Sequence, residues 1–359
     1  MLGECQSKCE HLAWVPLRPS VASELNRTAL IKGSAATTAI EGNTLTEEEI
    51  RRHLDGQLRL PPSREYLTCE VDNVVGEFNR IVGEVIAGRS LPLDPETIMR
   101  LNGAVLEGLD LHEGVIPGEI RSYQVGVGLY RGAPPEDCES LLRRLCEWLE
   151  EIETPEGMRI VFAILRAVLS HLYLAWIHPF GDGNGRTARL IEFQILVDSG
   201  VPAPAAHLLS SHYNRTRAEY YRQLEQASIS GGDVIPFLMY AVQGFLDGLR
   251  EQLEWIRAQM WDVVWRNFVH EMFRDKTSAS QTRKRHLALD LSLATEPIPI
   301  SQVPKLSPRL AMAYARKTAK TLTRDINALI EMGLVRRTPE GVRARREVIL
   351  AFLPASASP

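Results

Sequence analysis

Residues 178–189 read His-Pro-Phe-Gly-Asp-Gly-Asn-Gly-Arg-Thr-Ala-Arg, and this stretch decides how the whole chain is interpreted. Apolar residues recur at helical spacing before it, in 156–177, and after it, in 185–198. Three glycines at alternate positions allow a tight turn between these two helices, so that backbone N–H groups converge on one point. The second helix directs its positive N-terminal end at the same point. The stretch therefore predicts an anion site.

The polar side chains of this turn indicate which anion it binds. Arg186 and Arg189 fall in the first turn of the second helix, where cations are unfavourable unless an anion lies between them. Asp182 is a hard oxygen ligand that suits Mg²⁺ (or Mn²⁺) bridging phosphates, although aspartate is also a common turn former. His178 can take a proton from an attacking hydroxyl, although a core histidine would fit the same pattern. Together these residues predict phosphoryl or nucleotidyl transfer.

The common nucleotide-binding motifs do not explain this stretch. The chain contains neither G-x-x-x-x-G-K-[ST] nor G-x-G-x-x-G, and a helix precedes the turn where those folds require a strand. The stretch resembles instead the signature of Fic-domain proteins, H-P-F-x-[DE]-G-N-G-R-x-x-R, and matches every specified position. Residues 117–135 are similar to the family's flap, and residues 220–224 to its helix near the nucleotide base. The resemblance covers roughly residues 20–250.

The resemblance implies a protein adenylyltransferase, which transfers AMP from ATP to a Ser, Thr or Tyr hydroxyl of a protein. His178 would be the general base for attack on the α-phosphorus, and pyrophosphate would leave. Related Doc-type kinases carry Lys at the position of Gly183, so the glycine favours AMP transfer. The resemblance assigns metal binding to Asp182, phosphate binding to Gly183, Asn184, Gly185, Arg186 and Arg189, loop anchoring to Phe180, and nucleotide contact to Tyr220 and Tyr221, which could also be plain core aromatics.

Residues 37–43, Thr-Thr-Ala-Ile-Glu-Gly-Asn, are similar to the family's inhibitory motif, [ST]-x-x-x-E-[GN]. Glu41 ends a helix predicted over 23–40, where a negative charge without a cation partner costs about 0.3–1 kcal/mol. We expect Arg189 to be that partner in a bidentate pair, which would occupy the arginine that the γ-phosphate needs. The resemblance also implies that such a glutamate can position water to remove AMP from a modified protein. The alternative for Glu41 is a plain solvated carboxylate.

The patterns predict a mostly α fold with a β-hairpin and a C-terminal winged helix-turn-helix domain, and the resemblance implies that the helices form a Fic-type helical bundle with the hairpin as its flap. The flap is predicted from apolar alternation over 123–129, and its edge could pair with an extended target segment or be only a surface hairpin. Thr46 and Glu49 form a capping box at the start of a further helix. The predicted domains are an N-terminal helical region with the inhibitory helix (1–95), a Fic core (96–250), a helix and linker (251–285) and the winged helix-turn-helix domain (286–359).

The C-terminal region is basic, since residues 301–359 hold 11 Lys and Arg against 4 Asp and Glu. A recognition helix is predicted over 313–332, and a two-stranded wing over 334–337 and 342–352. This arrangement suits DNA phosphates. Our second hypothesis is therefore a DNA-binding regulator with the Fic core as a nucleotide-sensing module; a face for dimerisation or protein docking is equally compatible. The basic residues are Arg316, Lys317, Lys320 and Arg324 on the helix and Arg336, Arg337, Arg343, Arg345 and Arg346 on the wing.

Composition limits the compartment and the partners. The 359 residues are 45% hydrophobic and carry a net charge of −4, so no global field favours nucleic acid or membranes. Five cysteines, an odd and sparse number, indicate free thiols in a reducing cytoplasm. No secretory signal is expected, and residues 158–177 are interpreted as a buried helix in which His171 is structural. The modified hydroxyl could belong to another protein or to the chain itself, and the resemblance suggests a homodimer.

Overall fold

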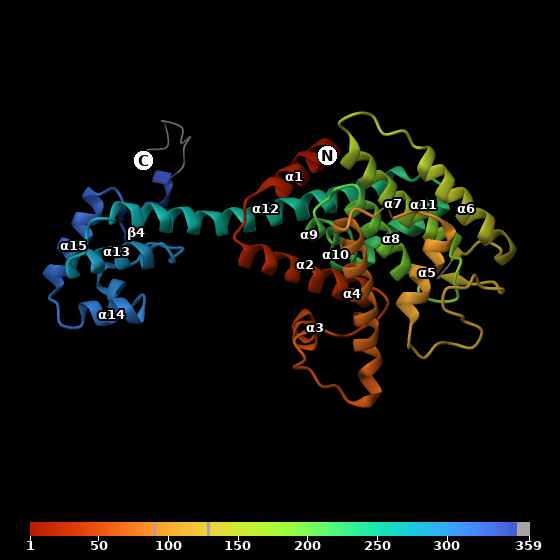
Figure 1. Ribbon diagram of the computed structural model, residues 1–359, viewed down its shortest axis with the longest axis horizontal. Helices are drawn as coiled ribbons and strands as arrows, with labels where there is room; N and C mark the ends of the chain where they lie inside the picture. Colours follow the sequence, from red (N-terminus) through yellow and green to blue (C-terminus); the bar gives the residue numbers. More distant parts are fainter. Residues whose placement is uncertain (90, 128–129, 350–359) are drawn as a thin grey trace. The chain divides into compact units, whose positions relative to one another are not determined.

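The computed structural model is mostly helical and describes residues 1–89, 91–127 and 130–349 (Figure 1). The chain folds into two compact units, Met1–Leu253 and Glu254–Pro359. Each unit has an apolar core of its own. The predicted boundary at 95/96 does not separate domains, because helices from both sides of it pack together in the first unit.

The first unit consists of helices and one small hairpin. Helix α12 begins in this unit and contributes its last residues to the second. The elements are α1 (Leu2–Trp14), α2 (Pro19–Ala39), α3 (Glu47–Leu54), the 3-10 turn η1 (Pro62–Arg64), α4 (Glu65–Ile86), α5 (Pro95–Leu106), β1 (Gly126–Val127), β2 (Tyr130–Arg131), α6 (Pro135–Glu151), α7 (Arg159–Ile177), α8 (Asn184–Asp198), α9 (Ala203–Ala206), α10 (Leu208–Arg215), α11 (Arg217–Ile229) and α12 (Ile235–Met272).

Helices α7 and α8 form the centre of this unit, with α4 and α5 against α8 and α1 and α6 against α7. Helix α7 is apolar on all sides, which is typical of a helix buried within a fold. In the described part of the chain it alone is long and apolar enough to cross a membrane, and 61% of its most apolar window is buried inside the protein. Burial of this kind is what the core helix of a globular unit shows.

The inhibitory motif lies where α2 ends. Gly42 adopts a left-handed backbone (φ 106°), and Asn43 then fixes the turn. The Asn43 amide donates to the Leu67 carbonyl (2.8 Å), and its Oδ1 accepts from the Leu45 N–H (3.0 Å). The predicted capping box of Thr46 and Glu49 is confirmed at the start of α3.

The flap is a short antiparallel hairpin of β1 and β2. The sequence predicts a strand over 123–129, but the first strand of the hairpin covers only Gly126–Val127. Tyr123 and Val125 lie outside the ladder of paired residues. Leu129 lies outside the described residues. The flap base is held by Gln124, whose Nε2 donates to the Gly132 carbonyl (2.7 Å).

Up to residue 349, the second unit contains the C-terminal half of α12, three further helices and a two-stranded antiparallel hairpin. A bridge between Ile298 and Val342 joins the hairpin to the preceding loop. This is the order of elements predicted for a winged helix-turn-helix domain, and that assignment stays a prediction. The elements are α13 (Ala279–Leu291), the 3-10 turn η2 (Ile300–Lys305), α14 (Pro308–Tyr314), α15 (Ala319–Glu331), β3 (Val335–Thr338), β4 (Gly341–Ala344) and the 3-10 turn η3 (Arg346–Ile349).

Three predictions for this region are wrong in part. The linker expected up to residue 285 is helix from Ala279 onward, because the Ser278 hydroxyl caps α13. The single recognition helix expected over 313–332 is interrupted between Tyr314 and Ala319, because Thr318 is extended and begins a new helix. The second strand of the wing ends at Ala344 and a 3-10 turn follows, while residues 350–359 lie outside the described part.

Candidate active site

The turn between α7 and α8 begins at His178, which ends α7 in a left-handed conformation (φ 49°). It is the one residue other than glycine with positive φ in the described part of the chain. Such a conformation costs about 1–3 kcal/mol unless the surroundings hold it. The next residues reverse the chain and bury Phe180 in the core, as predicted for the loop anchor.

Asn184 closes the turn with its own side chain. Its Oδ1 accepts from the Phe180 N–H (3.0 Å), and its Nδ2 donates to the Phe180 carbonyl (2.8 Å). Gly183 has positive φ (77°), and its carbonyl accepts from the Thr187 hydroxyl (2.8 Å). The side-chain amide of Asn184 is engaged in these two hydrogen bonds. The backbone N–H of Asn184, at the start of α8, is the group left for a phosphate.

Two buried residues that the sequence reasoning missed support the turn. Asn102 of α5 donates to the Asp182 carbonyl (2.9 Å) and accepts from the Gly118 N–H (3.1 Å). Arg121 donates to the carbonyls of His178 (2.8 Å), Tyr123 (2.7 Å) and Ala133 (2.6 Å), which joins the flap base to the turn. Asn102 interrupts the apolar face of α5, and a polar residue in such a position is the signal that could have found it.

His178 faces the cavity with a neutral imidazole. Its Nδ1 lies 3.4 Å from the Ala175 carbonyl. Burial lowers its pKa below the ordinary value of 6.5, and the nearby Arg121 acts in the same direction. The base of the flap packs against the Cβ of His178, since a methyl group added at Gly132 would lie 3.2 Å from that atom. The ring is therefore able to accept a proton near neutral pH.

Arg189 is fully buried and pairs with the end of α2. One of its terminal nitrogens donates to the Glu41 carboxylate (2.5 Å) and to the Thr37 carbonyl (2.9 Å). The predicted contact between Glu41 and Arg189 is thus present, through one carboxylate oxygen. Burial raises the pKa of Glu41, but the adjacent Arg189 outweighs it, and the pKa lies below its ordinary value.

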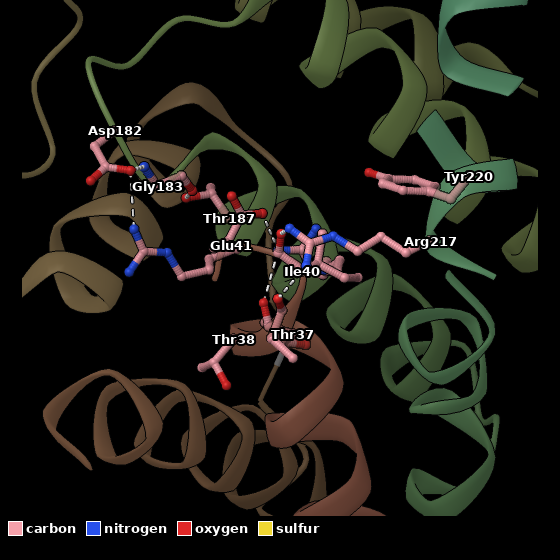
Figure 2. Close-up of polar contacts among 12 residues, drawn as sticks. Thr37, Thr38, Ile40, Glu41, Asp182, Gly183, Thr187, Arg217 and Tyr220 are labelled. Carbon is pink, nitrogen blue, oxygen red and sulfur yellow. Dashed lines mark hydrogen bonds and ion pairs between the residues drawn. The ribbon is translucent and has the colours of Figure 1, made fainter. Parts of the chain in front are cut away.

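The Glu41 carboxylate lies directly on the N-terminal turn of α8. A methyl group added at Gly185 would meet its Oε1 at 2.1 Å. Figure 2 shows Glu41 between Gly183 and Thr187 on one side and Arg217 on the other. The carboxylate therefore occupies the point at which the sequence predicts an anion.

Asp182 and Arg186 form a second charged group at the turn. Arg186 is buried and donates to the Asp182 Oδ1 (3.0 Å) and to Glu70 (3.3 Å). The same Asp182 oxygen accepts from the Gly183 N–H (2.5 Å), and the side chain is 43% exposed, which leaves its other oxygen toward solvent. In the described residues no three acidic, histidine or cysteine side chains cluster as metal ligands. A single carboxylate with phosphate oxygens is nevertheless a donor set that suits Mg²⁺.

A cavity of about 480 Å³ opens beside these groups and is lined by Glu41, His178, Gly185, Tyr220 and Tyr221, among others. Pockets for small ligands have volumes of roughly 300–1,000 Å³. The cavity thus brings the predicted base, the predicted inhibitory glutamate, the start of α8 and the two predicted nucleotide contacts to one place.

Tyr220 is held at the cavity by a buried polar network. Its hydroxyl lies 2.8 Å from Nε2 of His171, whose Nδ1 lies 3.0 Å from Glu192. Tyr213 donates to the other oxygen of Glu192 (2.8 Å). His171, which we interpreted from the sequence as structural, is buried and also lines the cavity. Its structural role is to hold the Tyr220 hydroxyl at the wall of the cavity.

Arg217 of α11 holds the end of the inhibitory segment, and the sequence reasoning missed it. Its guanidinium donates to the carbonyls of Ala39 (3.1 Å) and Ile40 (2.6 Å). The Tyr221 hydroxyl also donates to the Ile40 carbonyl (3.2 Å). A cation at the negative end of α2 is favourable, and here it comes from a helix far away in the sequence (Figure 2).

Comparisons with known proteins agree with this geometry. The model of the Fic/DOC family matches residues 92–196. "Protein adenylyltransferase fic-1" of Caenorhabditis elegans is 32% identical over 217 residues, which are 58% of this chain and 38% of the relative. "Protein adenylyltransferase Fic" of Nematostella vectensis is 30% identical over 245 residues, which are 68% of this chain and 53% of the relative. The chain thus spans about half or less of the length of these relatives.

Solved structures share the fold. A Fic family protein from Desulfovibrio desulfuricans has a TM-score of 0.60 at 22% identity, over 96% of this chain and 94% of that chain. A fragment of Fic-1 from C. elegans has a TM-score of 0.59 at 24% identity, over 72% of each chain. These structures share the fold, and the match of the family model shows that residues 92–196 of this chain form a domain of the Fic/DOC family.

Proposed function

We propose that this chain is a protein adenylyltransferase, which transfers AMP from ATP to a Ser, Thr or Tyr hydroxyl of a protein. The observation that carries the proposal is that His178 and the start of α8, where an anion would bind, line one cavity of nucleotide size. Burial lowers the pKa of His178, which suits a base. The relatives named protein adenylyltransferase support it. The target hydroxyl belongs to another protein or to a second site on the chain itself.

The proposed reaction uses His178 as the general base. Its Nδ1 faces the Ala175 carbonyl, so the proton stays there and Nε2 accepts the hydroxyl proton. The hydroxyl oxygen forms a bond to the α-phosphorus as the bond to pyrophosphate breaks. Backbone N–H groups of Asn184 and Gly185 hold the phosphates, with the dipole of α8 behind them, and the Gly183 N–H joins them once Asp182 releases it. Tyr220 and Tyr221 line the space for the nucleoside.

Charges at the turn complete the proposed phosphate site. Arg186 and Arg189 are the cations for the β- and γ-phosphates. Asp182 would hold Mg²⁺, which neutralises phosphate charge when bound. Arg186 already pairs with Asp182, so the two side chains are mutually oriented before a nucleotide arrives.

We further propose that Glu41 inhibits this reaction in the resting chain. Its carboxylate engages Arg189 and lies on Gly185, where a phosphate oxygen would have to bind. A terminal phosphate and this carboxylate repel each other, so ATP binds productively only after the end of α2 moves. The same ionised carboxylate could orient water for removal of AMP from a modified protein.

Isotope-labelled ATP tests the reaction type. The Glu41→Gly variant is incubated with a protein mixture and with ATP labelled at the α- or the γ-phosphate. Transfer of AMP predicts protein-bound label from the α-position and none from the γ-position. Label from the γ-position alone would show phosphate transfer and overturn the proposal. Glu225→Gly, which removes another carboxylate lining the cavity, is the matched control and should remain as inactive as the wild type.

A further inference from the structure

The cations of the second unit differ in whether a carboxylate neutralises them. Residues 254–359 carry 18 Lys and Arg against 10 Asp and Glu, although the whole chain has a net charge of −4. One group is neutralised locally by carboxylates. Its ion pairs are Arg266 with Asp262, Arg274 with Glu271, Arg283 with Asp325, Arg309 with Asp290, and Arg336 and Arg343 with Glu347.

Three cations outside these ion pairs form an exposed row that leads into α15 and along it. Lys317, Lys320 and Arg324 are exposed and follow one another at spacings of three and four, from the turn before the helix into its first two turns. None of them takes part in an ion pair within the described part of the chain. The opposite side of α15 is apolar and buried, so the helix is fixed with these cations outward.

The β3–β4 hairpin extends this row. Arg337 of β3 is exposed and donates to the Oδ1 of Asn327 on α15 (2.8 Å). The hairpin therefore reaches the same side of the helix. We call the surface formed by Lys317, Lys320, Arg324, Asn327 and Arg337 the basic face.

We infer that the basic face binds duplex DNA. Unpaired cations on successive turns of a helix suit a row of phosphates, and an α-helix fits the major groove, which is about 12 Å wide. The Asn327 amide and the Thr321 hydroxyl, which line a hollow on α15, add neutral hydrogen-bonding groups. Ala328 and the exposed carboxylate of Glu331 also line this hollow, so the uninterrupted row of cations lies on the N-terminal part of α15.

The inference rests on the second unit alone and is independent of AMP transfer. Each unit has its own core, and every residue of the basic face lies in the second. Loss of the catalytic His178 should therefore leave DNA binding unchanged.

The test is fluorescence anisotropy of a labelled duplex of mixed sequence titrated with the full chain between 50 and 200 mM salt. Lys320→Glu with Arg324→Glu removes two cations of the basic face. Arg266→Glu with Arg274→Glu changes the net charge equally at two exposed, ion-paired residues, one on α12 and one in the turn that follows it. Circular dichroism and thermal unfolding confirm that both variants fold.

The first variant should lose at least about tenfold in affinity at 50 mM salt, and its salt slope should fall by about two, since each phosphate contact contributes about 0.9. The control should stay within about threefold of the wild type. Equal losses in both variants would show general charge attraction and overturn the inference. Binding of polyglutamate as tightly as DNA would also overturn it, in favour of an acidic protein partner, as would the absence of salt-dependent DNA binding.

Discussion

His178 combines a strained backbone with a buried, neutral ring, and both features follow from its position at the end of α7. Its side chain takes no part in the phosphate turn, which Asn184 and Gly183 hold through their own contacts. Loss of the imidazole should therefore affect proton transfer and leave the nucleotide site intact.

We predict that His178→Ala and His178→Asn lower AMP transfer by about 10²–10⁴-fold in the Glu41→Gly background, while ATP affinity stays within a few-fold. Asparagine tolerates the left-handed backbone well and so controls for strain. His11→Ala, on an exposed histidine of α1, should have no effect. Rates come from label transfer and affinities from calorimetry. Transfer retained by either His178 variant would remove the general-base role.

The pH dependence of transfer tests the same residue. A base must be neutral, so kcat/KM should fall as the pH drops through its pKa. Burial lowers the pKa of His178, while Glu41 raises it, so the Glu41→Gly variant should have its acidic limb below pH 6.5. The measurement is kcat/KM for that variant between pH 5 and 8. An acidic limb above pH 6.5 would contradict a buried, neutral base.

The residues of the phosphate turn could be predicted from the sequence, but the side chains from other segments that hold the turn and the inhibitory segment in place could not. Residues 178–189 are contiguous, so one turn brings their side chains to one point. Arg121 and Arg217 act through backbone carbonyls of other segments, and no local pattern reports such a contact. The pairing of Glu41 with Arg189 could be predicted because each charge is at an unfavourable helix end.

At the scale of elements, the end of α2 is the part that must move for ATP to bind productively under the proposed inhibition. Arg217 and Tyr221 of α11 both donate hydrogen bonds to the carbonyl of Ile40, which is the residue before Glu41. Tyr221 and Ile40 also line the cavity, so a nucleotide bound there would lie next to the contacts that hold the inhibitory segment.

We predict that Arg217→Met raises the basal transfer rate of the otherwise wild-type chain by about fivefold or more, but less than Glu41→Gly does. It removes two hydrogen bonds, each worth about 0.5–1.5 kcal/mol, and keeps much of the side chain. Arg222→Met, on the same helix at a residue that pairs with Glu219, is the matched control. Equal rates for Arg217→Met and the wild type would show that this contact does not restrain the segment.

Strongly periodic helices were predictable within a few residues, and irregular boundaries were not. The core helices α7 and α8 carry long apolar patterns, whereas the sequence predicted no bounds for α1 within the helical region expected over 1–95. That helix is fixed by Cys5 and Cys9, which are free and buried, with thiol pKa values raised by burial to about 11 and about 12. In the second unit, the interruption between α14 and α15 depends on the extended backbone of Thr318, which spacing alone does not reveal.

At the scale of the whole molecule, charge and packing divide the chain in the same way. The acidic first unit contains the Fic/DOC domain and the inhibitory segment in one core, so the segment packs as part of the domain that we propose it inhibits. The sequence predicted two regions here because residues 1–95 and 96–250 have separate local patterns. Packing of α2 and α4 on α8 joins them, and such long-range packing is not visible in local periodicity.

The most direct test is the intact mass of the wild type, Glu41→Gly and Glu41→Gly with His178→Ala after incubation with ATP and Mg²⁺, alone and with a cell lysate. The account predicts a mass increase of one AMP group, on the chain or on a lysate protein, with Glu41→Gly. That increase should be weak or absent in the wild type and absent in the double variant. Equal modification by the wild type and Glu41→Gly, or an AMP adduct that persists without His178, would contradict the central claim.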